Sequence, residues 1–167
     1  MAGKDHLEGK KILIVDDEPD VLETLAELLS MCDVVRASSF AEAEKAMNEG
    51  AFDIVLLDIM GVNGYKLLDI ATKKKLTAVM LTAHAMSVED TKKSYMKGAA
   101  FYVPKDELPN IVTFLNDVLD AQKKGKSTWR RWMDRLEWYY DNRFGPGWQH
   151  SDKEFWDNIL DKRDKGL

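Results

Sequence analysis

The stretch AFDIVLLDIMGVNG, residues 51–64, carries an aspartate at the end of an apolar run. The β-branched and aliphatic residues from Ile54 to Leu57 are typical of a strand buried on both faces. A carboxylate at the end of such a strand is costly unless other groups pair with it. The pattern therefore predicts a strand over residues 53–59 that carries Asp58 to partners supplied by other parts of the chain.

Four further apolar runs resemble this one and are separated by stretches with helical spacing. The predicted strands are residues 11–15, 33–37, 53–59, 78–81 and 101–103. The predicted helices begin at Pro19, Ser39, Tyr65, Ser87 and about Glu107, and the last runs to Lys124. Strands that alternate with helices favour right-handed crossovers and a parallel sheet covered on both faces. The fold class is thus α/β, a doubly wound five-stranded sheet that binds ligands at the carboxyl ends of its strands.

Composition limits the classes of function. The chain has 167 residues, 45% of them apolar, and a net charge of −5, which disfavours broad nucleic-acid binding. The single cysteine, Cys32, cannot form an intramolecular disulfide and fits a reducing compartment. The early apolar run of residues 12–15 is too short for a signal peptide or a membrane span, so we expect a cytoplasmic protein.

A different kind of sequence follows the linker AQKKGKST, residues 121–128. All five tryptophans lie beyond it, and FGPGW, residues 144–148, interrupts the helical pattern there. We expect a first domain over residues 9–124 and a two-helix aromatic tail over residues 125–167, packed on itself or on the first domain. A base-stacking platform or a partner or dimer surface remain alternatives. From residue 126 onward, nine basic against eight acidic residues argue against grasping phosphates.

Polar residues follow the predicted strands where each strand ends: Asp16 and Asp17, Asp58, Thr82 and Lys105. Three carboxylates brought together repel one another unless a cation lies among them, and Mg²⁺ is the natural partner of such an oxygen set. A carboxylate can also attack phosphorus and become an aspartyl phosphate. Magnesium, an ammonium and a hydroxyl would then stabilise the added oxygens.

The motifs ILIVDDEP, LLD, MLTAH and MKGAAFYVPK, in this order, resemble the receiver domain of two-component response regulators. The resemblance covers roughly residues 9–124 and implies the flavodoxin-like strand order 2-1-3-4-5. It also implies that a histidine kinase or a phosphotransfer protein donates a phosphoryl group. The roles carried over are phosphoacceptor for Asp58, Mg²⁺ ligands for Asp16, Asp17, Asp58 and the backbone carbonyl of Met60, phosphoryl contacts for Lys105 and Thr82, and conformational switch for Thr82 and Tyr102.

The sequence departs from the family pattern in the loop after the phosphoacceptor. Val62 stands where the family usually has proline, and Gly64 comes two residues early, so the loop is about two residues shorter. In addition, Pro104 precedes Lys105, whereas the family commonly has a proline after the lysine. The role of Glu18 stays open between a place at the acidic pocket and a solvated helix start.

Several readings compete with a phosphorylated switch. A degenerate receiver could act as a phosphorylation-independent interaction module, and a DNA-binding output through the tail is a third option. A phosphatase of the haloacid-dehalogenase type would need an aspartate in place of Met60, and no glycine-rich nucleotide loop is present. We expect no enzyme beyond self-catalysed phosphotransfer and autodephosphorylation, and a homodimer through the last receiver helix or the tail is possible.

Overall fold

The computed structural model describes residues 5–83 and 87–162. The chain forms two compact units, Met1–Thr113 and Phe114–Leu167. Within the described residues, no helix has both the length and the apolar character needed to cross a membrane. The predicted domain boundary after residue 124 stays a prediction, since helix α5 (Ile111–Lys123) runs across the division between the two units.

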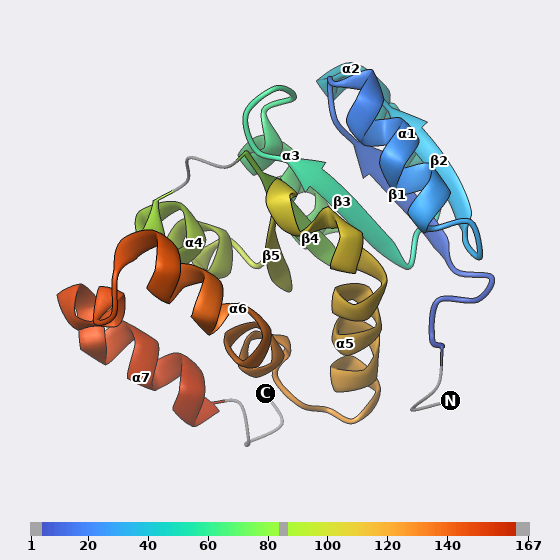
Figure 1. Ribbon diagram of the computed structural model, residues 1–167. Coiled ribbons are helices and arrows are strands. Elements are labelled where there is room, and N and C mark those ends of the chain that lie inside the picture. Colours follow the sequence, from blue (N-terminus) through green and yellow to red (C-terminus); the bar gives the residue numbers. More distant parts are fainter. Residues whose placement is uncertain (1–4, 84–86, 163–167) are drawn as a thin grey trace. The chain divides into compact units, whose positions relative to one another are not determined.

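The first unit is built around one parallel sheet, shown in Figure 1. Its strands are β1 (Lys11–Val15), β2 (Asp33–Ala37), β3 (Ile54–Asp58), β4 (Ala78–Thr82) and β5 (Phe101–Pro104). They lie in the order β2-β1-β3-β4-β5, which confirms the predicted order and the α/β class. Every residue of β3 and β4 is buried, which explains their uninterrupted apolar sequences. Pro104 closes the edge strand β5, where a missing N–H is tolerated.

Four helices join these strands: α1 (Pro19–Leu28), α2 (Phe40–Glu49), α3 (Gly64–Lys73) and α4 (Val88–Met96). The crossover from β1 to β2 runs in one direction along the sheet, and the next three crossovers run in the other. Right-handed crossovers therefore place α1 on one face and the other three helices on the opposite face. The direction changes between β1 and β3, and this switch point is where open α/β sheets bind ligands.

Side-chain caps begin two of these helices as predicted. The Ser39 hydroxyl accepts from the Glu42 N–H at 3.2 Å, and the Ser87 hydroxyl accepts from the Asp90 N–H at 3.2 Å. The Glu42 carboxylate accepts from the N–H of Ser38 at 2.7 Å, one residue before the position that a regular capping box would use.

The last predicted helix begins later than expected. Residues Lys105–Asn110 form the 3₁₀ helix η1, and α5 starts only at Ile111. Pro109 explains the difference, because it has no N–H to donate within an α-helix interior, whereas a short 3₁₀ turn tolerates it.

The second unit contains the predicted pair of tail helices, α6 (Thr128–Phe144) and α7 (Lys153–Lys162), joined through the 3₁₀ helix η2 (Trp148–Asp152). The Ser127 hydroxyl caps α6 by accepting from the Trp129 N–H at 3.2 Å. Gly145 ends α6 with a φ of 87°, and such a positive φ favours glycine because it has no Cβ.

The tail aromatics pack on one another, as expected. Trp132 is fully buried, and its ring centroid lies 5.0 Å from that of Tyr140 in an edge-to-face contact. The Trp156 ring stacks on Trp132 at 6.0 Å and also meets the edge of Trp148 at 4.9 Å. Such pairs contribute beyond their buried area, so they account for a compact unit with few aliphatic residues.

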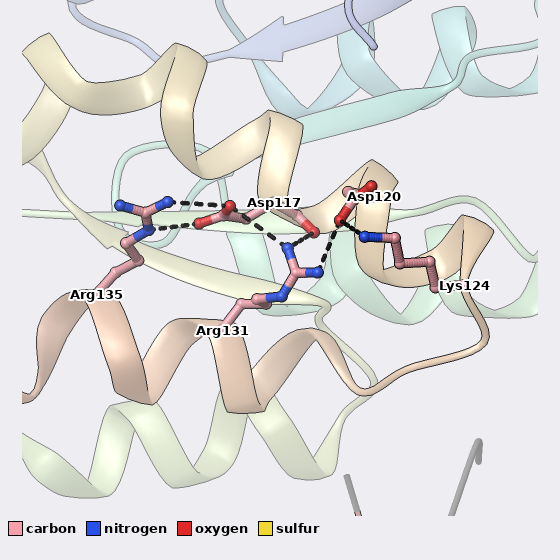
Figure 2. A network of polar contacts seen from close by, with 5 residues as sticks. All are labelled: Asp117, Asp120, Lys124, Arg131 and Arg135. Atoms are coloured by element: carbon pink, nitrogen blue, oxygen red, sulfur yellow. Dashed lines mark hydrogen bonds and ion pairs between the residues drawn. The ribbon is translucent and has the colours of Figure 1, made fainter. Parts of the chain in front are cut away.

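Ion pairs join the carboxyl-terminal part of α5 to α6 (Figure 2). Arg135 donates to both oxygens of Asp117, from Nε at 2.7 Å and from a terminal nitrogen at 3.3 Å. Arg131 donates to Asp120 at 2.7 Å, and Lys124 lies 3.1 Å from the same carboxylate. Arg131 and Lys124 lower the pKa of Asp120 to about 2. The two arginines therefore serve contacts within this unit.

Candidate functional site

The candidate site lies where the strands of the first unit end. Asp16 directly follows β1, and Asp58 and Thr82 are the last residues of β3 and β4. Lys105 directly follows β5. Parallel strands point their carboxyl ends to the same edge of the sheet, so residues far apart in the chain meet there.

Lys105 brings three carboxylates together. Its Nζ lies 2.8 Å from Asp16 Oδ2, 3.0 Å from Glu18 Oε1 and 3.1 Å from Asp58 Oδ1. Asp16 is fully buried, and Asp58 is 4% exposed. Burial raises the pKa of Asp16, although its hydrogen bond with Lys105 opposes the shift. Burial alone would lower the pKa of Lys105, but the bonds with Asp16 and Glu18 outweigh it and raise that pKa. The ammonium therefore stays charged and compensates the buried carboxylates.

Asp17 lies at the open side of this cluster. Its side chain is exposed, and its carboxylate rests on Gly61 so closely that a Cβ on that glycine would lie 2.1 Å from Oδ1. Carboxylate oxygens of Asp16, Asp17 and Glu18 lie within 4.8 Å of one another. A group of carboxylate oxygens beside open solvent suits Mg²⁺, which retains several waters when it binds. The residues present therefore fit this ion.

The loop after Asp58 forms a closed turn. The Gly61 N–H donates to Asp58 Oδ2 at 3.0 Å, and the Gly64 N–H donates to the Ile59 carbonyl at 2.9 Å. Val62, in the place of the family's proline, is buried with 2% exposure. Met60 points outward and is 76% exposed. The buried Val62 side chain and the bond from Gly64 to Ile59 thus fix the loop. The N–H of Gly61 in addition holds the Asp58 carboxylate.

Thr82 and Tyr102 lie close together in the interior. The Thr82 hydroxyl donates to the Ala83 carbonyl at 3.1 Å, so it would have to turn to reach a phosphoryl group. Tyr102 is fully buried, which raises the pKa of its phenol, and hydrogen bonding with Thr82 and Thr91 opposes that shift. The hydroxyls of Thr82 at the end of β4, Tyr102 on β5 and Thr91 on α4 thus lie in one hydrogen-bonded region.

A contact between α3 and α4 was not predicted from the sequence. The Tyr65 hydroxyl donates to Asp90 Oδ1 at 3.0 Å, and the Lys93 ammonium lies 4.2 Å from the centre of the Tyr65 ring. Burial raises the pKa of Tyr65 to about 12. Because Tyr65 follows Gly64, this contact ties the end of the shortened loop to the start of α4.

Comparison with known proteins identifies the fold and its family. The sequence model of the response regulator receiver domain matches residues 12–116, which include every residue of the candidate site. The chain belongs to the receiver domain family. Among solved structures, a CheY-like receiver domain from Methanospirillum hungatei superposes with a TM-score of 0.63 at 28% identity. It covers 70% of this chain and 98% of its own. The NtrX receiver domain from Brucella abortus has a TM-score of 0.59 at 29% identity, over 65% and 98%.

Sequence relatives of this receiver include much longer proteins. The two-component response regulator ARR18 of Arabidopsis thaliana is 34% identical over 114 residues, 62% of this chain and 18% of that protein. The transcriptional activator protein PfeR of Pseudomonas aeruginosa is 31% identical over 99 residues, 57% of this chain and 32% of that protein. The chain therefore spans about a fifth of the length of the plant regulators it matches.

Proposed function

We propose that this receiver is a phosphorylation-dependent signalling switch whose phosphoacceptor is Asp58. The observation that carries the proposal is the position of Lys105, whose Nζ lies 3.1 Å from Asp58 Oδ1 and 2.8 Å from the fully buried Asp16. An ammonium held between two buried carboxylates balances their charge before a phosphoryl group arrives, and it can contact phosphoryl oxygens afterwards.

The proposed reaction transfers a phosphoryl group from a phosphohistidine of a histidine kinase or a phosphotransfer protein. A lone pair of an Asp58 oxygen forms the new P–O bond, while the P–N bond breaks and its electrons return to the imidazole. The Gly61 N–H keeps the carboxylate oriented, and the Thr82 hydroxyl turns from the Ala83 carbonyl toward the phosphoryl oxygens. Asp16, Asp17, Asp58 and the Met60 carbonyl would hold Mg²⁺, which neutralises charge on those oxygens when bound.

A phosphoryl mimic tests the proposal without a cognate kinase. Beryllofluoride with Mg²⁺ is expected to bind the wild-type protein in a one-to-one complex, detected by fluorine-19 NMR, and to fail with Asp58→Asn. Asp33→Asn is a matched control, because it makes the same substitution at an exposed position. Asp33 is the first residue of strand β2 and so lies at the end of the strand away from the site. That variant is expected to bind like the wild type.

Equal binding by the wild type and Asp58→Asn would overturn the phosphoacceptor assignment. Absence of binding by the wild type would instead favour the degenerate receiver, an interaction module that works without phosphorylation. The two outcomes separate a wrong residue from a wrong function.

For the tail we propose a packing and partner-binding role instead of nucleic-acid binding. Its buried rings contact one another, and Arg131 and Arg135 are paired with Asp120 and Asp117. These arginines are therefore poorly placed to contact phosphates. A salt-dependent shift with duplex DNA, lost on removal of residues 126–167, would contradict this. We also propose that the protein acts in the cytoplasm, where its phosphodonor would meet it.

A further inference from the structure

Glu18 lies beside the site but outside the set of residues assigned to it. It is the residue before α1, and its side chain makes no hydrogen bond that caps the helix. Instead, its carboxylate Oε1 lies 3.0 Å from the Nζ of Lys105, which is 87 positions further along the chain. The side chain of Glu18 is therefore committed to the phosphoryl-binding lysine.

Three carboxylates surround Lys105, and its contact with Glu18 has the geometry of a hydrogen bond. An ammonium has three protons, and three carboxylates lie 2.8, 3.0 and 3.1 Å from it. A phosphoryl group on Asp58 would take the place of that carboxylate beside Lys105 and add further acceptor oxygens, so it would compete with Asp16 and Glu18 for the ammonium. Asp16 is fully buried and would be left uncompensated, whereas the Glu18 side chain is 62% exposed and can turn into water. Glu18 is thus the partner that is released most easily.

We propose that Glu18 competes with the phosphoryl group for Lys105 and so weakens the hold of the protein on that group. The proposal rests on the function proposed for Asp58. Glu18 acts here as a positioning residue, because its exposed carboxylate holds the Lys105 ammonium by a hydrogen bond. Its negative charge, two residues after Asp16, also repels the phosphoryl oxygens once they are bound.

Glu18→Gln tests the competition. It keeps the shape of the side chain but removes its charge, so beryllofluoride should bind more tightly at saturating Mg²⁺. We expect its dissociation constant to fall by roughly two- to fivefold, the range over which exposed ion pairs contribute. Fluorine-19 NMR titration measures the constant. Without beryllofluoride, nitrogen-15 NMR of the Lys105 ammonium should show faster proton exchange with water in the variant.

Two further variants separate contact from overall charge. Glu27→Gln makes the same change of charge on an exposed residue of α1, and it should leave the dissociation constant unchanged. Glu18→Asp keeps the charge but shortens the side chain by one methylene, which weakens its reach to Lys105. We expect it to tighten binding in the same direction as Glu18→Gln.

Unchanged or weaker binding by Glu18→Gln overturns the proposal, provided that the wild type binds. Tighter binding by Glu27→Gln of the same size also overturns it, since net charge would then explain the effect. If the wild type does not bind beryllofluoride, both this proposal and the function proposed for Asp58 fail. Tighter binding by Glu18→Gln alone, together with the faster exchange at Lys105, supports the competition.

Discussion

Gly64, the first residue of α3, leaves no room for a side chain, and Gly64→Ala is expected to destabilise the first unit. A Cβ there would lie 2.2 Å from the Asp58 carbonyl oxygen, 2.7 Å from the Ile59 Cα and 2.9 Å from the Asp58 carbonyl carbon. All three atoms belong to the backbone of Asp58 and Ile59. They cannot rotate away as the end of a side chain can, so the loop itself must move.

Two opposing effects decide the magnitude. Overpacking costs about 1–3 kcal/mol, and a clash with backbone belongs at the upper end. Alanine is favoured over glycine inside helices by up to about 1 kcal/mol, which offsets part of this cost. We therefore expect a net loss of about 2 kcal/mol in the free energy of unfolding. For a unit of this size, that corresponds to a decrease of roughly 8 °C in melting temperature.

Thermal unfolding followed by far-ultraviolet circular dichroism is the suitable assay, because all five tryptophans lie in the tail and their fluorescence would report on that unit. Gly50→Ala is the matched control. A Cβ at Gly50 would meet its nearest atoms at an ordinary 3.4 Å, so this variant should be neutral or slightly stabilised. Equal or higher stability of Gly64→Ala relative to the wild type would refute the steric argument.

Three more predictions concern the proposed Mg²⁺ site and the tail. Gly61→Ala should leave the melting temperature nearly unchanged but weaken Mg²⁺ binding at least about tenfold by calorimetry, because its Cβ displaces only the exposed Asp17 carboxylate. The pKa of Asp120 is lowered to about 2, so its charge stabilises the tail above pH about 4 and this stabilisation is lost as the pH falls toward 2. Urea unfolding followed by tryptophan fluorescence should therefore show the free energies of unfolding of the wild type and Asp120→Asn converging over that range. Arg135→Ala should destabilise the tail by about 1–3 kcal/mol in the same assay, because it removes both hydrogen bonds to the buried Asp117.

Each of these predictions has a clear contrary result. Unchanged Mg²⁺ affinity in Gly61→Ala would mean that Asp17 is not a ligand. A stability difference between wild type and Asp120→Asn that persists undiminished at pH 2 would exclude the ion pairs as its cause. Arg130→Ala is the control for Arg135→Ala, because within the described part of the chain Arg130 pairs only with Asp134, at 3.4 Å and on the surface. Equal losses in the two arginine variants would contradict a special role for the Asp117 pair.

The strands could be predicted because buried parallel strands have a simple pattern, whereas their order was implied by the resemblance to the receiver family. The uninterrupted run Ile54–Leu57 is apolar since both faces of β3 are covered, and the alternation with helices determines the crossovers. The sequence predicts the start of α5 too early, because the same apolar spacing continues through a 3₁₀ helix around Pro109. Local propensity distinguishes these two kinds of helix poorly.

Which side chains meet at the strand ends was predictable, but not how they pair. Asp58 ends strand β3, and Asp16 and Lys105 directly follow strands, so topology alone brings them together. The contact of Glu18 with Lys105 depends on side-chain directions that no spacing in the sequence reveals. The same holds for Gly61 and Gly64, whose importance comes from the distance between backbones and not from a motif.

The residues of the site come from distant parts of the sequence, and this determines when the site forms during folding. Asp16 and Lys105 lie far apart in the sequence of the first unit. They meet only when β1, β3, β4 and β5 are joined in one sheet. Contacts between such distant segments form late and slowly in folding. A growing or partly folded chain exposes Asp58 without its lysine, so it lacks the charge compensation that the proposed phosphoryl transfer requires. The proposed phosphoryl-accepting function would therefore be acquired only together with the complete fold.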